Sequence, residues 1–378
     1  MDVGAPRGLL RAFGQLKDPR VNRTRRHSLG DILAIAICGI ICGADGWTQV
    51  ADFGRCKIKW FKTFLALPNG IPSHDTFGRV FAALDPKAFE ECFMRWISGL
   101  ATVTAGRLVA IDGKAIRRSL DSANGRAAIH LVSAWCAANH MVLGQLAVDA
   151  KSNEITAIPE LLKLLDIADA VVTIDAAGCQ KKIAQQIVDQ GGHYILQLKG
   201  NQGSLHQETE LLFAECLRDD CHGIAYSTAS TTDGGHGRIE ERRLWATSDV
   251  NWFAEKGKWR NLRSLIRVES KQTVGQETST EYRYYITDLP ADNASKLLAY
   301  IRGHWGVENN LHWCLDISFR EDERRIRKGH GAENFSRLSR MALNLLKAEK
   351  TLAGGIKTKR LCCGWDHDYL LKVLTGGI

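Results

Sequence analysis

Two aspartates each stand directly after a short apolar run that has the composition of a buried strand. Asp112 follows residues 108–111, and Asp175 follows residues 171–174. Aspartate is also frequent in turns and at helix N-caps, and either residue alone would be explained in that way. Their equivalent positions instead predict two carboxylates at one edge of a sheet. Because convergent carboxylates repel each other unless a cation lies between them, the pair predicts a metal site.

The chemistry of the donors indicates which metal this site would take. Carboxylate oxygens with no thiolate beside them suit Mg²⁺ or Mn²⁺, which keep bound waters and accept phosphate oxygens from a substrate. Lys114 lies two residues after Asp112 and would place a positive charge beside the site.

A third acid is expected from a helix that packs across the strand ends. The segment 302–316 has helical periodicity. Four of its residues recur on one face at three- and four-residue steps: Trp305, Glu308, His312 and Leu315. On a face bordered by Trp305 and Leu315, Glu308 is not expected to be a plain solvated residue. Three acids further along the chain are rival candidates for the third acid: Asp316, Glu321 and Asp322. Alternatively, these three residues simply form an exposed acidic helix end.

The periodicity of the first hundred residues predicts a helical N-terminal domain. Apolar residues recur with helical spacing between residues 29 and 97, without the alternation of strands. Within it, Ser73 is a predicted N-cap for a short helix that carries Phe77, Val80 and Phe81 on one side. This arrangement leaves open a helix-turn-helix that reads DNA and a cap-plus-helix motif with no such role.

From Arg107 the pattern changes to strands and then alternates. Strands are predicted over residues 108–111, 127–136, 141–149, 170–174 and 194–198, and helices over about 157–165 and 180–190. Three adjacent strands followed by alternating helix and strand is the order of an RNase H-like fold, within the α/β class. In that fold the first and fourth strands are neighbours, so Asp112 and Asp175 would converge.

Strand signals return at residues 242–246, 264–270 and 281–287, and helical ones over 294–319 and 332–349. The predicted organisation is a helical N-terminal DNA-binding or associated domain (1–104), a first part of the core (105–220), a β-rich insertion (221–290), a second part of the core with the third acid (291–350) and a C-terminal tail (351–378).

Composition and charge narrow the class of partner. The 378 residues carry a formal net charge of +8, which favours a polyanion such as nucleic acid. The basic residues gather at Arg20, Arg23, Arg25 and Arg26, at Lys114, Arg117 and Arg118, and at Arg324, Arg325, Arg327 and Lys328. The longest apolar run, residues 32–43, is too short to cross a bilayer, and no signal peptide precedes it. We therefore expect a cytoplasmic protein with no membrane partner, whose eleven cysteines are reduced.

The chain resembles the insertion-sequence DDE transposases, in the branch of the H-repeat-associated proteins, over nearly its whole length. The matching segments are 18–20, 26–29 and 71–77, then 111–114, 151–155, 174–180 and 198–202, and finally 236–240 and 302–322. The resemblance implies an RNase H-like catalytic core, and it places the family's three metal-binding acids on Asp112, Asp175 and Glu308.

The family's contacts to DNA carry over less completely. A Tyr, Arg, Glu and Lys set around the last acid would fall on Ile301, His304, Glu308 and Leu315, so that only the glutamate matches. Tyr300 and Arg302 are close but out of register, and His304, His312 and Lys328 are alternatives. The predicted DNA contacts are Lys114, Lys199, Arg238, Arg302, His304 and Lys328.

The implied mechanism uses two Mg²⁺ or Mn²⁺ ions about 3.5 to 4 Å apart to activate the attacking oxygen and stabilise the leaving one. Water would cut a strand at each terminal inverted repeat of the element, and the freed 3′-hydroxyl would attack target DNA. Synapsis of two ends favours a homodimer on the bacterial nucleoid. Two alternatives remain open, namely an RNase H-like nuclease that does not join strands, and an inactive DNA-binding relic.

Overall fold

The chain is seen in a computed structural model that describes residues 11–98, 107–120, 127–148, 153–218, 222–235 and 237–375. Of the predicted features, the end of the strand 141–149, Lys151 and Ser152, and His236 lie outside these ranges. The chain folds into two compact units. Unit 1 comprises Met1–Thr102, Gly113–Ser152 and Glu308–Ile378, and unit 2 comprises Val103–Asp112 and Asn153–Val307.

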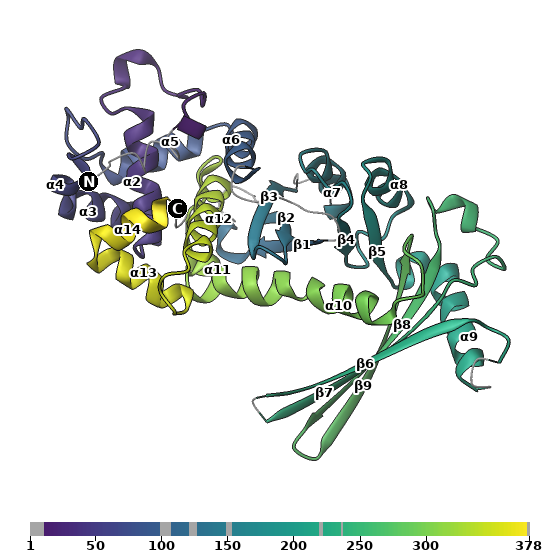
Figure 1. The fold of residues 1–378 in the computed structure, drawn as a ribbon. Coiled ribbons are helices and arrows are strands. Elements are labelled where there is room, and N and C mark those ends of the chain that lie inside the picture. The colour runs from purple at the N-terminus through teal and green to yellow at the C-terminus, as the bar shows by residue number, and fades with distance from the viewer. Residues whose placement is uncertain are drawn as a thin grey trace. The chain divides into compact units, whose positions relative to one another are not determined.

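Unit 1 is mainly helical, as its amphipathic and apolar segments predict. Its helices are α2 (Leu29–Ile41), α3 (Trp47–Cys56), α4 (Ile58–Phe61), α5 (His74–Ala83), α6 (Pro86–Ser98), α11 (Trp313–Ile317), α12 (Gly331–Ala348), α13 (Ile356–Trp365) and α14 (His367–Leu374), with short turns η1 (Asn22–Thr24), η2 (Arg117–Ser119) and η7 (Glu321–Glu323). Nearly every residue of α2 is buried, so this apolar helix is a core helix. It packs against α12, which also contacts α5 and α6 (Figure 1).

The predicted cap and helix after Ser73 are confirmed. The Ser73 hydroxyl accepts a hydrogen bond from the backbone N–H of Thr76, and α5 begins at the next residue. Phe77, Val80 and Phe81 are fully buried, and Trp47 stacks on Phe81 with 4.6 Å between ring centroids. The apolar face of α5 is therefore used for packing within unit 1.

The strands of unit 1 are β2 (Ile129–Cys136) and β3 (Met141–Ala147), which pair antiparallel, and the outgoing half of β1 (Leu108–Ile116). Their order is β3-β2-β1. The sequence predicted that β1 would end at Ile111, which is wrong. The strand continues through Asp112, Gly113 and Lys114 because backbone pairing carries on beyond the apolar run.

Unit 2 contains a mixed sheet with the order β1-β4-β5-β9-β8-β7-β6. Strands β4 (Val171–Ile174) and β5 (His193–Leu198) run parallel to β1. Helix α7 (Glu154–Lys163) precedes β4, and helix α8 (Lys181–Asp189) connects β4 to β5. All four residues of β4 are buried, as expected for a strand inside a parallel region. The observed class is mixed α/β, as predicted.

Two long antiparallel hairpins extend this sheet. They consist of β6 (Tyr226–Gly235), β7 (Arg238–Thr247), β8 (Ser264–Val274) and β9 (Glu277–Thr287), and β9 pairs with β5. Figure 1 shows their tips projecting away from the rest of unit 2. The sequence predicted three of these strands but not β6, because its Ser, Thr and Gly residues lack the apolar alternation of a half-buried strand.

The prediction of one continuous helix over residues 294–319 is wrong. Helix α10 (Ala294–His304) ends first, a π-helical segment (Val307–His312) follows, and α11 then begins. Helix α9 (Gly203–Arg218) in unit 2, and α13 and α14 in unit 1, were not predicted. The helix predicted over 332–349 is confirmed as α12.

Two expectations from composition can also be compared with the structure. None of the helices in the described ranges combines the length and the apolar character that a bilayer span requires. Among the residues that the structure describes, nine cysteines are free thiols. Cys216 is disulfide-bonded, so the prediction that all thiols are reduced is wrong at that position.

Candidate functional site

The two aspartates predicted to converge stand at the same level of adjacent parallel strands in unit 2. The last paired residues of β1 and β4 are Ile111 and Ile174, and Asp112 and Asp175 follow them directly. Because neighbouring strands lie about 4.8 Å apart, residues at equal register leave the sheet side by side. Both aspartates are half-buried. Pairing with β4 ends before Asp112 although β1 itself continues.

Asp175 also has the structural role that aspartates often take after a strand. Its Oδ1 accepts hydrogen bonds from the backbone N–H groups of Ala177 (3.1 Å) and Gly178 (3.4 Å). A Cβ on Gly178 would lie 2.3 Å from Cγ2 of Ile174, so only glycine fits where the turn folds back on β4. The turn thus fixes the direction in which the Asp175 carboxylate leaves the strand.

The last turn of α10 packs onto the same two strands. His304 Nδ1 and the Thr173 hydroxyl are hydrogen-bonded at 2.9 Å, and a Cβ on Gly303 would lie 2.3 Å from Leu108 Cδ2. Burial lowers the pKa of His304 to about 4, although the nearby Asp175 opposes this shift. At neutral pH the imidazole is therefore uncharged. Thr173 was not predicted as a site residue, although it is the one hydroxyl in an otherwise Val and Ile strand.

Glu308 lies in unit 1, at the start of that unit's third segment, and within the π-helical turn. Its side chain is exposed, like that of Trp305, whereas Leu315 is fully buried. The expectation that Glu308, Trp305 and Leu315 share one face is wrong, because the wider π-helical turn changes the angular spacing of the residues that follow it. Single π-helical turns are frequent at functional sites, which keeps Glu308 a candidate.

The rival acids are all engaged in ion pairs inside unit 1. Asp316 and Glu321 both contact the ammonium of Lys114, with Glu321 at 3.4 Å. Asp322 pairs with Arg117 at 3.3 Å. A carboxylate held by a neighbouring cation is poorly suited to hold a metal ion as well. Of the predicted third acids, Glu308 is therefore the one best suited to the role.

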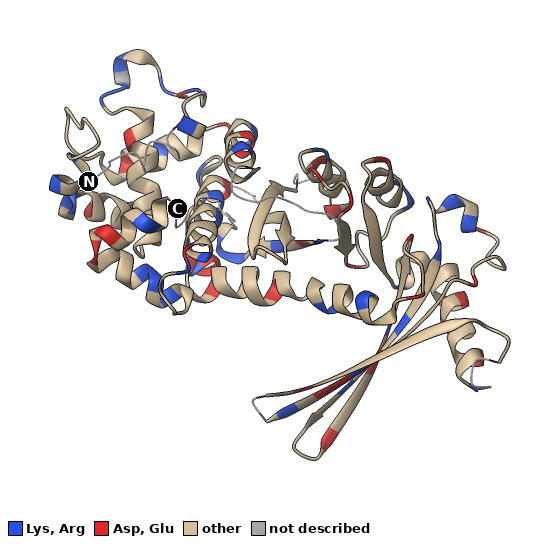
Figure 2. Cartoon of the chain, viewed as in Figure 1, with Lys and Arg blue, Asp and Glu red and all other residues tan. Residues whose placement is uncertain are grey.

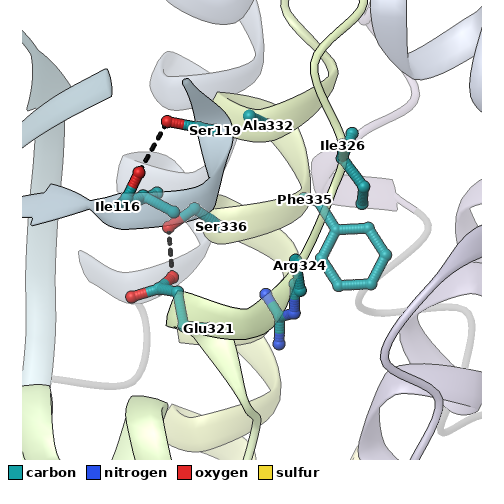
Figure 3. A pocket seen from close by; sticks show the side chains of 8 residues that line it. All are labelled: Ile116, Ser119, Glu321, Arg324, Ile326, Ala332, Phe335 and Ser336. Atoms are coloured by element: carbon teal, nitrogen blue, oxygen red, sulfur yellow. Dashed lines mark hydrogen bonds between the residues drawn. The ribbon is translucent and has the colours of Figure 1, made fainter. Parts of the chain in front are cut away.

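Glu321 is the centre of a buried polar network that the sequence did not predict. Its Oε1 accepts from the Ser336 hydroxyl (2.6 Å) and pairs with Arg340 (2.9 Å), both on α12. Figure 3 shows Glu321 and Ser336 lining a small cavity with Ile116 of β1. The only signal for this network in the sequence was the presence of Arg337 and Arg340 on the core-facing side of a helix.

The ionisation of Glu321 predicts a pH dependence of stability. Burial alone would raise its pKa, but Arg340, Lys114 and Arg324 lower it to about 2. Since the unfolded pKa is about 4.3, ionised Glu321 stabilises the fold above that pH, and this contribution is lost as the pH falls towards 2. We expect Glu321→Gln to be destabilised most above pH 5, with the difference from wild type shrinking towards pH 2. Urea unfolding of both proteins across this pH range measures the difference in their free energies of unfolding. A difference that does not change with pH would contradict the lowered pKa of Glu321.

The remaining residues predicted to contact DNA differ in their exposure and in whether they form ion pairs. Lys199 and Lys328 are exposed. Arg238 is exposed and pairs with Glu240 at 3.4 Å, whereas Arg302 is held by Asp233 at 2.5 Å. Figure 2 shows Lys and Arg interspersed with Asp and Glu along the hairpins. Some of these basic residues are paired with the acidic ones, as Arg242 is with Asp233 and Glu240.

The oxygen donors of Asp112 and Asp175, at equal register on adjacent strands, suit a hard divalent cation. Burial and the nearby Asp175 raise the pKa of the Cys179 thiol to about 12, so this thiol stays protonated at neutral pH. Within the ranges that the structure describes, no group of three or more His, Cys, Asp or Glu side chains is arranged to hold a metal ion. The aspartate pair in unit 2 is thus the part of the predicted site that the structure places together.

Comparison with known sequences assigns the chain to a family. Residues 104–345 match the family described as "Transposase DDE domain", and residues 10–97 match "DDE_Tnp_1-associated". The chain therefore belongs to the DDE transposase family, of the H-repeat-associated type that its motifs indicated.

Its relatives carry corresponding names. "Putative transposase YncI" of Escherichia coli O157:H7 is 41% identical over 97% of this chain and 94% of its own length. "H repeat-associated putative transposase YhhI" of Escherichia coli strain K12 is 38% identical over 97% and 98%. A shorter match, 46% identical over 14% of this chain and 64% of the relative, is to "Inactive transposase YbfQ" of the same strain.

Proposed function

We propose that this protein cuts DNA at the ends of an insertion sequence and joins them to target DNA, using Asp112, Asp175 and Glu308. The observation that carries the proposal is the equal register of Asp112 and Asp175 on adjacent parallel strands. The core that holds them is proposed to be RNase H-like. The antiparallel order β3-β2-β1 and the parallel order β1-β4-β5 support this proposal.

The three carboxylates would hold two Mg²⁺ or Mn²⁺ ions. Such ions lower the pKa of an attacking hydroxyl and stabilise the oxygen that leaves. The turn at Ala177 and Gly178 holds Asp175 in place for this task. Glu308 is exposed, whereas the rival acids Asp316, Glu321 and Asp322 are held in ion pairs, and this difference supports Glu308 as the third acid.

In the first step, water attacks a phosphodiester at each element end and leaves a free 3′-hydroxyl. In the second, that hydroxyl attacks a target phosphodiester and displaces the target's own 3′-oxygen. Exposed cations would bind the DNA backbone, with Lys199, Arg238 and Lys328 as the candidates. Arg302 would have to leave Asp233 before it could contact a phosphate. His304, being uncharged at neutral pH, would orient the site by its bond to Thr173.

The proposed partners are the terminal inverted repeats of the element and the target DNA, with a homodimer bringing two ends together on the nucleoid in the cytoplasm. The proposed division of labour follows the sequence. Residues 1–104 would assist DNA binding, 105–220 and 291–350 would form the catalytic core, 221–290 would be its β-rich insertion, and 351–378 the tail.

The test is cleavage and joining of labelled DNA that carries the element's own ends, with and without Mg²⁺. We expect the wild type to cut and join, Glu308→Gln to do neither while still binding DNA, and Asp322→Asn, which alters a rival acid that pairs with Arg117, to retain chemistry. An active Glu308→Gln would overturn the assignment of the third acid. Cutting of intact ends, with no joining of either intact or precut ends, would support a nuclease. Binding of DNA without cutting or joining would support a relic.

A further inference from the structure

Lys114 is a largely buried lysine whose ammonium contacts two carboxylates of unit 1. Its side chain is only 9% exposed, and its ammonium contacts Asp316 and Glu321, the latter at 3.4 Å. Glu321 is itself 1% exposed. A cation that binds a DNA phosphate must reach the surface, and this one would have to leave two carboxylates to do so. The sequence had suggested Lys114 as a DNA contact, and its surroundings indicate a different role.

The three residues join three elements of unit 1. Lys114 lies on the outgoing half of β1, two residues after Asp112 in the chain. Asp316 lies on α11, which continues directly from the π-helical turn that begins with Val307 and Glu308. Glu321 is anchored to α12 through Ser336 and Arg340. One ammonium thus connects β1 to the segment that carries Glu308, and α12 supports that connection.

We propose that Lys114 is a positioning residue that fixes the half of β1 following Asp112 to the segment carrying Glu308. This inference rests on the proposed function, since it assigns Lys114 to the support of the metal-binding acids. Residues that orient metal ligands without touching the metal commonly change metal affinity or activity about tenfold to a hundredfold when they are replaced. Lys114 would not touch the metal. It would hold in place the backbone segments that follow Asp112 and Glu308.

The chain offers a matched control in the same unit. Lys359 is also a buried lysine, 8% exposed, and pairs with a fully buried glutamate, Glu349, at 3.3 Å. Its ammonium also donates to backbone carbonyls at the end of α12. Lys359 connects α13 to the end of α12 through Leu346 and Glu349. Lys114→Met leaves Glu321 still paired with Arg340, whereas Lys359→Met leaves the buried Glu349 with the hydrogen bond from Tyr369 but without this cation. The control variant should therefore lose at least as much stability as Lys114→Met.

The experiment measures Mn²⁺ affinity by calorimetry, DNA affinity at several salt concentrations, joining rate and melting temperature for each full-length protein. We expect Lys114→Met to lower Mn²⁺ affinity and joining by about tenfold to a hundredfold, and Lys359→Met to change neither. DNA affinity and its salt dependence should be the same in all proteins. Lys114→Arg, which keeps the charge, should restore most of the Mn²⁺ affinity. If Lys114→Met does not fold, Lys114→Gln takes its place with the same expectations.

Two results would overturn the inference while leaving the proposed function intact. In one, Lys114→Met and Lys359→Met lose the same Mn²⁺ affinity and activity, which would make Lys114 merely structural. In the other, Lys114→Met weakens DNA binding and reduces the salt slope by about one phosphate contact, which would make Lys114 a DNA contact. A wild type that neither binds Mn²⁺ nor joins DNA would instead overturn the proposed function, and the inference with it.

Discussion

Replacing Asp175 with asparagine is expected to abolish strand cutting while leaving the fold and DNA binding unchanged. Asparagine keeps the side-chain oxygen that accepts from Ala177 and Gly178, so the turn is preserved while the charge is lost. Loss of a metal ligand removes several kcal/mol of transition-state stabilisation, which corresponds to a rate lower by at least about a hundredfold. Asp112→Asn is expected to behave in the same way.

A matched control for this substitution lies in the loop before β4. Asp166 is an exposed aspartate of unit 2 whose Oδ1 also accepts from the backbone two residues later, the N–H of Ala168, at 3.3 Å. Asp166→Asn should retain full activity. The measurements are single-turnover cutting of end-labelled DNA and a gel-shift titration with each protein. Activity of Asp175→Asn close to that of Asp166→Asn would remove Asp175 from the proposed site.

The largest effect on stability is expected at the buried pair of Arg337 and Glu90 in unit 1. Their side chains are 0% and 1% exposed. The guanidinium contacts Glu90 and also donates to Asn334 (2.9 Å) and Glu333 (3.1 Å), while Glu90 accepts from the backbone N–H of Gln145 (2.8 Å). Arg337→Met leaves a buried carboxylate without its cation, so we expect a loss of about 3–5 kcal/mol in the free energy of unfolding.

Chemical unfolding followed by circular dichroism measures this loss, and two further variants test its cause. The double variant Glu90→Gln with Arg337→Met removes both charges and should recover part of the lost stability. Arg55→Ala breaks an exposed pair with Asp52 and should have no measurable effect. If the double variant is less stable than Arg337→Met alone, the unpaired charge is not the cause of the loss.

The sequence located the apolar runs before Asp112 and Asp175 because buried strand segments can be recognised from local pattern, although β1 does not end at Ile111. An apolar run followed by a charged residue places Asp112 and Asp175, and the order of strands and helices then predicts that their strands are neighbours, as the pairing of β1 with β4 confirms. The equal register of the two residues could not be derived from pattern alone. It depends on hydrogen bonding between strands that are far apart in sequence.

The helical part of the site was predicted less well. A π-helical turn differs from an α-helix by its hydrogen-bonding pattern, and no residue between Val307 and His312 signals it in the way that proline signals a break. The ion pairs of Lys114 could not be predicted for a related reason. A lysine beside an acid suggests a surface cation, and only its packing against Asp316 and Glu321 reveals that its charge is neutralised internally.

The packing of α12 against α2, α5 and α6 has a consequence for the time course of synthesis. The N-terminal helices leave the ribosome first, but their partner begins only at Gly331. At the usual rate of about 5–20 residues per second, α2 waits on the order of ten seconds or more before α12 can cover it. During that interval its apolar surface is available to chaperones, and a chain cut short before α12 would keep that surface uncovered.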